Sequence, residues 1–472
     1  MRIRSVSTAV FSFVSLAAFG AAGGCHFDSG NPSKPDAAVA TPPPAAGGTG
    51  AFGIVTINGK QKMYLPQSLL NTSGHGVISV VDVGVAGQGV QGAPALITTI
   101  DLGVDDAGVA GFATATGGDA SMVIAASTQV PMIWFIDPTM DKVTKVVDLD
   151  PSVYGQSSFS GGGGYVTGIA FDGANKRAIL SVWNGFALVD LGSQSITKVI
   201  QAPPSENFGF DSVHERIIAP FYECSASTLL GDGGSVVMPS SCNGPVGPDG
   251  GAMTDGLSVI DLSDDTVYTY ENPAWGIPDD AGNFGPLADP NAPVGTEPDS
   301  AAIDPTSGVA VIPSEGSSLQ SVIDFSKAQF NKAAKTVTAP QQMIPGLSLE
   351  GVAIEYTSHL AFWEGEHSQD VAVANLTQAN AGSTAWVHGL MPPLPGGTQT
   401  SFSNLGDPHG IAVTTSNTSS GPVGFVVDAG LQWVARVDLA KMATNEGADA
   451  STELTETQMA PYVTYLDAQT KE

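Results

Sequence analysis

Five polar residues recur at one position of a repeated segment, and their types could hold a cation or move a proton. They stand just before the small residues of similar apolar segments, and they are Thr167, Asn207, Asp299, Glu350 and His409. Asn207, Asp299 and Glu350 carry the hard oxygen ligands that calcium prefers, and His409 could act as a base or a further ligand. The alternative is a polar, water-filled channel mouth whose residues only solvate one another.

The segments that follow these residues predict the innermost strands of a repeated unit. They are 168–171, 209–211, 300–304, 351–354 and 410–413. Their Gly, Ala and Ser residues are typical of strands that crowd around a central channel. We therefore expect the five polar side chains to point toward the same end of that channel.

A second recurring strand reads apolar-x-apolar-Asp-apolar, which indicates a repeat architecture. The copies are 79–83, 134–137, 187–191, 258–262, 321–325, 373–376 and 436–439. The carboxylate that ends the strand can accept backbone N–H bonds from the next tight turn, and Asn375 can do the same in its copy. We expect these side chains to be structural and to lie away from the channel.

The clearest unit spans residues 163–202, where strand patterns at 165–172, 177–182, 186–191 and 196–200 are separated by turn residues. Four strands in about 40 residues make one propeller blade. The sequence thus predicts an all-β, seven-bladed β-propeller with four-stranded antiparallel blades, and six or eight blades remain open. The expected blades are 51–103, 109–150, 163–202, 205–273, 296–340, 347–391 and 407–468.

The last predicted strand, near residues 462–466, is expected to help close the ring against the N-terminal blade. Closure would remove sheet edges that otherwise invite aggregation. Two insertions are expected in the propeller domain, at about 224–255 and 275–295. Loops of that length are functional or floppy, and acidic glycine-rich stretches within them could bind calcium or be solvated turns.

The segment Gly168-Ile169-Ala170-Phe171-Asp172, followed by Val-x-Asp-Leu and Thr-x-x-Val strands, resembles the YVTN-type and lactonase-like propeller repeats. Pro408-His409-Gly410 is similar to the beginning of an NHL repeat. The resemblance covers most of residues 76–440. It implies the propeller fold for a group that includes surface-layer and adhesion proteins, lactonases and other hydrolases. It also implies a divalent cation at the channel mouth, held here by Asn207, Asp299 and Glu350.

The N-terminus reads as a secretion signal, because Arg2 and Arg4 precede an apolar stretch, Ser5–Ala22. The residues before Cys25 resemble a bacterial lipobox, which implies that residues 1–24 are removed and Cys25 is acylated. Ordinary signal cleavage and an uncleaved anchor are the alternatives. Residues 25–50, rich in Pro, Ala and Gly, would then be a tether, and residues 51–472 the propeller domain.

The chain carries a net charge of −29, and this acidity argues against nucleic acid and against anionic lipid headgroups as partners. Cys224 and Cys242 remain beyond Cys25, and in an exported protein we expect them to form a disulfide. Two free thiols are the alternative.

Together these features predict an exported lipoprotein of the cell envelope, anchored in the outer membrane, monomeric and without a certain cofactor. It would bind or scaffold a protein or glycan ligand at the cell surface. The alternative function is a metal-dependent hydrolase of lactonase or esterase type that uses calcium and His409 at the channel mouth. Because propellers host many activities, the fold alone does not decide between these functions.

Overall fold

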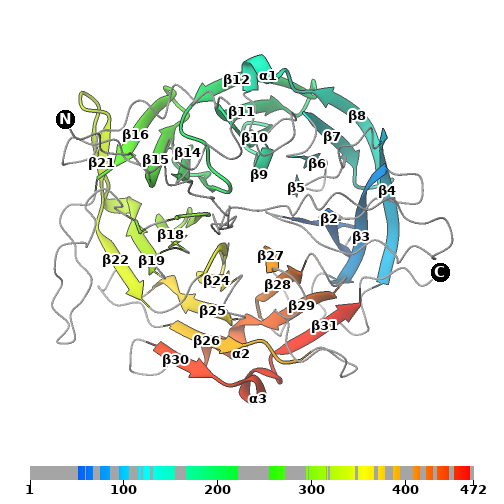
Figure 1. The fold of residues 1–472 in the computed structure, drawn as a ribbon, viewed down its shortest axis with the longest axis vertical. Coiled ribbons are helices and arrows are strands. Elements are labelled where there is room, and N and C mark those ends of the chain that lie inside the picture. The colour runs from blue at the N-terminus through cyan, green and yellow to red at the C-terminus, as the bar shows by residue number, and fades with distance from the viewer. Residues whose placement is uncertain are drawn as a thin grey trace, which may run out of the picture.

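The computed structural model is a ring of seven blades, which confirms the predicted fold (Figure 1). The structure describes residues 52–58, 60–66, 75–85, 95–105, 115–118, 121–127, 131–154, 166–221, 255–271, 294–295, 297–314, 316, 319–345, 349–365, 370–377, 386–393, 408–414, 421–428, 433–445 and 451–467.

The first three blades each use four consecutive antiparallel strands. Blade one comprises β1 (Gly53–Ile57), β2 (Lys60–Pro66), β3 (His75–Val85) and β4 (Ala95–Asp105). Blade two comprises β5 (Ala115–Gly118), β6 (Val123–Ala126), β7 (Met132–Asp137) and β8 (Lys142–Asp148). The short helix α1 (Pro151–Tyr154) follows. Blade three comprises β9 (Val166–Asp172), β10 (Arg177–Val182), β11 (Gly185–Asp190) and β12 (Ser195–Gln201).

The next two blades share an additional hairpin. Blade four comprises β13 (Gly209–Asp211), β14 (Arg216–Phe221), β15 (Gly256–Asp261) and β16 (Thr266–Tyr270). Blade five comprises β17 (Ala302–Asp304), β18 (Val309–Ser314), β19 (Leu319–Asp324) and β22 (Gln341–Pro345). Between β19 and β22 the chain forms a 3₁₀ turn, Phe325–Lys327, and a hairpin of β20 (Gln329–Asn331) and β21 (Thr336–Thr338).

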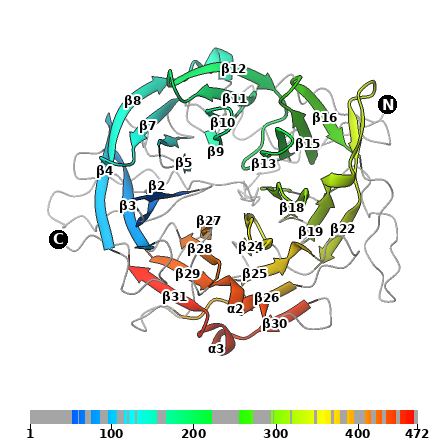
Figure 2. The ribbon, with the colours of Figure 1, turned by 180° about the vertical axis from the view of Figure 1, so that it is seen from behind.

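The last two blades are linked in a similar way. Blade six comprises β23 (Gly351–Glu355), β24 (Leu360–Glu364), β25 (Asp370–Asn375) and β26 (Trp386–Leu390). Blade seven comprises β27 (Pro408–Thr414), β28 (Val423–Asp428), β29 (Trp433–Asp438) and β31 (Val463–Asp467). Between β29 and β31 the chain forms α2 (Leu439–Ala443), β30 (Ser451–Leu454) and α3 (Glu456–Met459), and β30 and α3 lie at the outside of the ring (Figure 2).

Two outer edges are covered by a strand from the following blade. β21 of blade five pairs in parallel with β16 of blade four, and β30 of blade seven pairs in parallel with β26 of blade six. The fourth strand of blade five is β22, just beyond the approximate blade end expected at residue 340, because the hairpin before it joins the sheet of blade four. Covering an edge satisfies backbone groups that would otherwise be open to another chain.

The predicted closure by the last strand is wrong. β31 pairs with β29 as the outer strand of its own blade, and β1 pairs with β2 in blade one. Blades one and seven meet through side chains of their sheet faces, in a cluster that includes Leu65, Val81 and Phe425. The reason is that blade seven already draws its fourth strand from the C-terminal segment.

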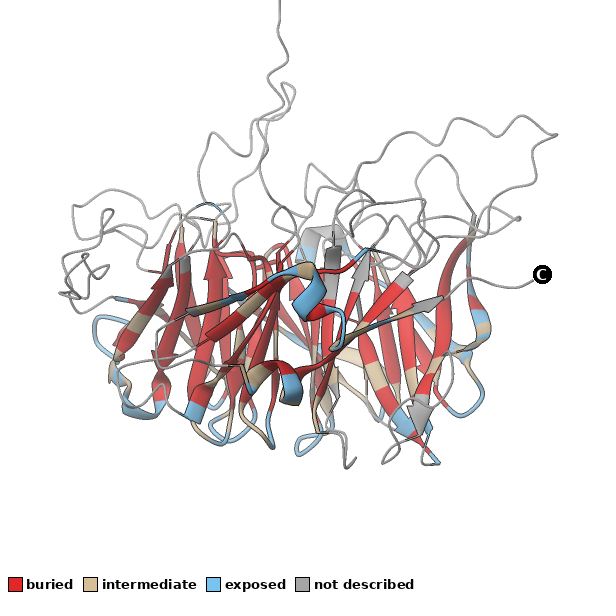
Figure 3. Ribbon diagram, turned by 90° about the horizontal axis from the view of Figure 1, so that it is seen from below, coloured by how far each residue is buried: buried red, intermediate tan, exposed pale blue. Residues whose placement is uncertain are grey.

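The buried hydrophobic residues among those described fall into seven clusters, each between two neighbouring blades. Successive residues of a strand point to opposite faces, so one strand serves two junctions. In β3, for example, Val80 packs toward blade two and Val81 toward blade seven. Strands that are covered on both faces have sequences of continuous apolar residues. Figure 3 shows the strands as buried and the short turns at the lower end of the view as exposed.

The strand-three carboxylates behave as predicted. Asp137 accepts the backbone N–H of Thr139 at 2.7 Å, and Asp190 accepts that of Ser193 at 2.7 Å. Asn375 accepts that of Thr377 at 3.0 Å. In blades five and seven the equivalent residues, Asp324 and Asp438, instead cap the helical turns that lead into the additional strands. The exception is Asp82, which lies within β3 rather than at its end.

The inner strands are as crowded as their small residues predict. A Cβ added to Gly209 would lie 3.1 Å from the backbone nitrogen of Ile303 in the next blade, whereas one added to Gly173 meets nothing within 4 Å. We expect Gly209→Val to lower the free energy of unfolding by about 1–3 kcal/mol, because the neighbouring backbone must move. Gly173→Val should change it little. Urea denaturation measures both, and an equal loss would contradict the crowding of the inner strands.

Candidate functional site

Two ends of the ring can be defined by the inner strands. The mouth end is where the first strand of each blade begins, at Thr167, Asp299 and Glu350. The turn end is where that strand ends, at the inner-turn carboxylates of blades three to six, and there the connections from strand three to strand four also lie. The inner-turn carboxylates are Asp172, Asp211, Asp304 and Glu355.

Three of the predicted site residues lie at the mouth end with little exposure. The side chains of Thr167, Asp299 and Glu350 are buried, with relative exposures of 5%, 2% and 6%. Asn207 is half-buried, and its own amide oxygen accepts the backbone N–H of Phe208 at 2.9 Å. His409 lies at an irregularity in the pairing of β27 with β28, and its side chain lies outside the described residues.

Backbone groups join these residues from blade to blade. The hydroxyl of Thr167 donates to the carbonyl of Ser205 at 3.2 Å, and the N–H of Asn207 donates to the carbonyl of Asp299 at 3.3 Å. The hydroxyl of Ser300 donates to the carbonyl of Glu350 at 2.5 Å. These hydrogen bonds connect the segments at the start of the first strands of blades three to six to one another at the mouth end.

The register of blade four differs from the sequence-based expectation. Asp211 and Asp172 occupy the same place in their sheets, since each pairs with the first residue of the second strand. Counting back the same distance from each carboxylate, the residue equivalent to Thr167 is Glu206 and not Asn207. Glu206 is 8% exposed. The fixed spacing from the inner-turn carboxylate was the signal that could have found it.

A further carboxylate missed by the sequence analysis is Glu364, at the end of β24. It is 2% exposed, its carbonyl accepts the N–H of Glu350 at 3.0 Å, and its side chain lies over Gly351, where a Cβ would come within 2.6 Å of its oxygen. Gly351 is therefore needed for the carboxylate to reach this place. Nothing in the repeat pattern marks Glu364, because it belongs to the second strand.

The mouth end therefore presents buried carboxylates from three consecutive blades, which are Glu206, Asp299, Glu350 and Glu364. Among the residues that the structure describes, no group of three or more His, Cys, Asp or Glu is placed to hold a metal ion. The calcium site of Asn207, Asp299 and Glu350, with His409 as base, stays a prediction. Asp299 and Glu350 are its two charged oxygen donors.

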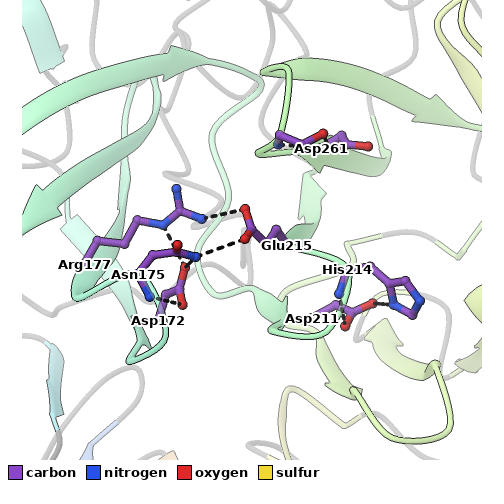
Figure 4. Close-up of polar contacts among 8 residues, drawn as sticks. Asp172, Asn175, Arg177, Asp211, His214, Glu215 and Asp261 are labelled. Carbon is purple, nitrogen blue, oxygen red and sulfur yellow. Dashed lines mark hydrogen bonds and ion pairs between the residues drawn. The ribbon is translucent and has the colours of Figure 1, made fainter.

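At the turn end, charged side chains bridge neighbouring blades (Figure 4). Arg177 donates from Nε to Asp172 at 2.8 Å within blade three, and its terminal nitrogen lies 3.4 Å from Glu215 of blade four. Asn175 donates to both Asp172, at 2.8 Å, and Glu215, at 3.0 Å. These contacts join the inner turns of blades three and four.

The residues that reach back to the preceding blade share a left-handed backbone conformation. They close four-residue turns, and they are Asp141, Gln194, Glu215, Asp265 and His359, with φ between 51° and 57°. For residues other than glycine this conformation is uncommon and costs free energy. Its repeated use implies that the contacts it permits compensate for that cost.

Each of these turn-end contacts joins a different pair of residues. Lys62 of blade one binds Asp141 at 2.7 Å. Lys145 of blade two donates to the carbonyl of Gln194 at 2.6 Å, and Lys198 of blade three binds Asp265. We call these contacts, with Arg177–Glu215 and His359–Asp304, the turn-end latches.

In blade five, the residue at the corresponding turn position has no side chain that could make such a contact with blade four. Gly308 occupies the left-handed position, with φ of 73°, and a Cβ there would meet the backbone nitrogen of Ser326 at 2.9 Å. With no side chain at this place, Asp211 of blade four pairs instead with its own His214, at 2.7 Å. The absence of a reaching side chain is thus matched by a local partner for the carboxylate.

Asp304 is the most buried of the inner-turn carboxylates, with no exposed surface. It accepts the N–H of Thr306 at 2.9 Å and the hydroxyl of Ser307 at 2.7 Å, and it lies 2.5 Å from Nδ1 of His359 in blade six. Burial alone would raise the pKa of this carboxyl, but the hydrogen bonds from Ser307, His359 and Thr306 outweigh burial and lower it.

This lowered pKa predicts a loss of stability in acid. A carboxyl whose folded pKa lies below its unfolded value, about 3.9, stabilises the fold fully above that value and loses the contribution as the pH falls through the folded pKa. We expect the stability difference between wild type and Asp304→Asn to shrink as the pH falls below about 4. Urea denaturation at pH 7 and pH 3 measures it, and a difference that does not change with pH would contradict the prediction.

The positive charges of the propeller are confined to the turn end. Every lysine and arginine between residues 51 and 467 lies either in a connection at the turn end or in a strand. Those in strands lie at the middle of the strand or nearer to the turn end. The lysines and arginines are Lys60, Lys62, Lys142, Lys145, Lys176, Arg177, Lys198, Arg216, Lys327, Lys332, Lys335, Arg436 and Lys441.

The mouth end of the described chain carries acids. They are Asp105, Asp148, Asp150, Glu206, Asp255, Glu271, Glu297, Asp299, Glu350, Glu364, Asp370, Asp428 and Asp467. The turn end, where acids and bases are paired in the latches, holds a mixture of both signs. Among the described residues, negative charge is therefore unevenly distributed between the two ends.

Several predicted features lie outside the described residues. They are the signal segment 1–24, Cys25 and the tether to residue 50, Cys224 and Cys242, and most of both insertions. None of the helices in the described part of the chain is long and apolar enough to cross a membrane.

Comparison with known proteins identifies no family. No protein-family model matches the chain, and no curated protein matches it. Solved structures with a similar course include a complex of KlAtg21 with the coiled-coil of AgAtg16, at 7% identity and a TM-score of 0.45 over 86% of this chain and 97% of that one.

Two further solved structures have a similar course. One is a functionally unknown protein from Desulfotomaculum acetoxidans, at 11% identity and a TM-score of 0.44 over 84% of this chain and 98% of that one. The other is Kuenenia stuttgartiensis hydrazine synthase, at 14% identity and a TM-score of 0.41 over 74% of this chain and 93% of that one.

Proposed function

We propose that this chain is an exported, envelope-anchored β-propeller that binds or scaffolds a partner, and that the mouth end meets the ligand. The observation that carries the proposal is the division of charge between the two ends. The lysines and arginines between residues 51 and 467 lie in the turn-end half of the propeller, where several of them join neighbouring blades. That end is occupied by contacts that hold the ring together.

Two features of the mouth end, its long connections and its acids, support it as the binding end. The two longest connections of the propeller, between β14 and β15 and between β16 and β17, join strand ends there. Its acids favour a cationic or neutral ligand and disfavour an anionic one, since like charges repel during approach. A cationic protein surface or a neutral glycan fits this end, and a nucleic acid does not.

The binding end can be tested with polymers of defined charge. The mature protein is immobilised, and binding of poly-L-lysine, dextran and heparin is measured by interferometry at low and moderate salt. A mouth variant neutralises Asp148, Glu271 and Glu297, and a matched turn variant neutralises Asp137, Asp190 and Asp261. We expect the mouth variant to weaken poly-L-lysine binding several-fold more than the turn variant.

Equal weakening by both variants would show that net charge alone controls binding and would contradict a binding end at the mouth. Strong binding of heparin would contradict the same proposal, because an acid-rich mouth should repel a polyanion. Binding of dextran that survives moderate salt would indicate a neutral glycan ligand.

Anchoring rests on Cys25 and the small residues before it. We expect bacteria that export the full chain to incorporate labelled palmitate into it and to retain it in the membrane fraction. Cys25→Ala should abolish the label and move the protein to the soluble fraction, because acylation requires the thiol. Cys242→Ser is the matched control and should keep the label. A labelled Cys25→Ala protein would contradict lipid anchoring at this residue.

A second candidate function, a metal-dependent lactonase or esterase, is favoured by the buried carboxylates of Asp299 and Glu350 in neighbouring blades. If it is correct, calcium binds the purified protein stoichiometrically by calorimetry. Asp299→Asn and Glu350→Gln then remove both binding and hydrolysis of a lactone panel. Hydrolysis that survives both substitutions, or no calcium binding, would overturn this candidate and leave the binding function.

A further inference from the structure

The seven junctions between blades are not equivalent, because six of them are crossed by the chain and one is not. The blades follow one another in chain order, from β1–β4 in blade one to β27, β28, β29 and β31 in blade seven. The chain passes from each blade directly to the next. Between blade seven and blade one there is no such passage, and we call this junction the seam.

The chain-crossed junctions are also reinforced by other means. Lys62–Asp141 joins blades one and two, Lys145–Gln194 joins two and three, and Arg177–Glu215 joins three and four. The parallel pairing of β16 with β21 joins blades four and five, and that of β26 with β30 joins six and seven. His359–Asp304 joins five and six.

An apolar cluster lies between the two sheet faces of the seam. From blade one it takes Phe52, Met63, Leu65, Val81 and Val83, and from blade seven Ala412, Val423, Phe425 and Val434. Packing of two faces can be separated without breaking the hydrogen bonds within either sheet. At the other junctions, separation would also break the side-chain contacts or the parallel strand pairs named above.

We propose that the ring opens reversibly at the seam while the individual blades stay folded. Such an opening moves blade one away from blade seven and exposes the faces that carry Val81 and Val434. It gives a partner a lateral route to the inner strands β1 and β27 that does not pass the mouth end. The inference does not depend on the ligand or on export.

Single cysteines placed on the two faces of one strand can detect this opening. Val80 and Val81 are neighbours in β3, both fully buried, but Val80 packs against blade two and Val81 lies in the seam. In β29, Val434 lies in the seam and Val437 packs toward blade six, again both fully buried. Valine and cysteine have similar volumes, so all four variants should fold.

The protein with each substitution, Val81→Cys, Val80→Cys, Val434→Cys or Val437→Cys, is exposed to a small thiol reagent under native conditions. Peptide mass mapping distinguishes the new thiol from native cysteines. We expect the seam cysteines to react about tenfold faster or more than their neighbours on the same strand, because sub-global opening exposes one face only.

Equal rates within both pairs would overturn the proposal, since local unfolding of a strand exposes both of its faces. Reaction of the seam cysteines only at the rate of global unfolding, measured in parallel by denaturant dependence, would overturn it as well. If one pair is destabilised by substitution, the other pair still decides the outcome, because the two strands lie on opposite sides of the seam.

Discussion

Replacing Asp304 by alanine is expected to lower the free energy of unfolding by about 3 kcal/mol, because the change removes a buried carboxylate with three partners. Thr306, Ser307 and His359 would each lose an acceptor, and His359 would no longer join blade six to blade five. Guanidinium denaturation followed by tryptophan fluorescence measures the loss. His359 is partly exposed, at 25% of its side chain, so solvent offsets part of the cost.

Asp190→Ala is the matched control for Asp304→Ala. Asp190 ends a strand and accepts turn hydrogen bonds from Ser193, but it lies at the surface and contacts only its own turn. Its loss should therefore be much smaller. Similar losses for the two variants would mean that the link between blades five and six contributes nothing beyond the turn itself.

Replacing Trp134 by alanine is expected to cost about 3–5 kcal/mol, the usual range for truncating a fully buried aromatic side chain. Trp134 has no exposed surface, and its indole N–H donates to the carbonyl of Leu102 in blade one at 3.1 Å. The cavity would open directly in the junction between blades one and two. Thermal and denaturant unfolding both report the change.

Trp134→Phe separates the two contributions of this residue. Phenylalanine keeps most of the apolar volume and loses the hydrogen bond, so a loss of about 1–2 kcal/mol is expected. If the alanine and phenylalanine variants were equally unstable, the hydrogen bond to Leu102 and not packing would dominate. That result would contradict the assignment of the junctions to apolar packing.

The fold was predictable because the same local sequence features recur in most blades. The Asp or Asn side chain that ends strand three accepts turn hydrogen bonds in blades two to seven, and the small inner-strand residues meet the backbone of the next blade, as at Gly209. Both features are local and periodic, so a single sequence carries them. The blade number followed from counting the copies.

What escaped prediction depends on contacts between distant segments. The hairpin of β20 and β21 and the strand β30 look like ordinary connections in the sequence, because strand propensity does not say which sheet a strand will join. Closure by β31 failed for the same reason. Glu206 was missed because Asn207 occupies the place of the small residue that marked the other inner strands.

The position of the candidate site could be predicted from the sequence, but its full set of side chains could not. Thr167, Asp299 and Glu350 do lie at one end of the inner strands, whereas Glu364 enters from a second strand that the repeat does not mark. The use of the turn end for joining blades could not be foreseen, since left-handed residues such as Glu215 and His359 are not recognisable by type.

The central claim is that the charged side chains of the turn end join neighbouring blades, while the acids of the mouth end are left for a ligand. The most direct measurement compares the denaturation midpoints of two triple variants with equal charge change. The turn-end set is Asp141→Asn, Glu215→Gln and Asp265→Asn, and the mouth-end set is Asp148→Asn, Glu271→Gln and Glu297→Gln. We predict a lower midpoint for the turn-end set, because its latches are lost, and an unchanged or higher midpoint for the mouth-end set, because repulsion is relieved. Equal or reversed changes in the two midpoints would contradict this division of roles.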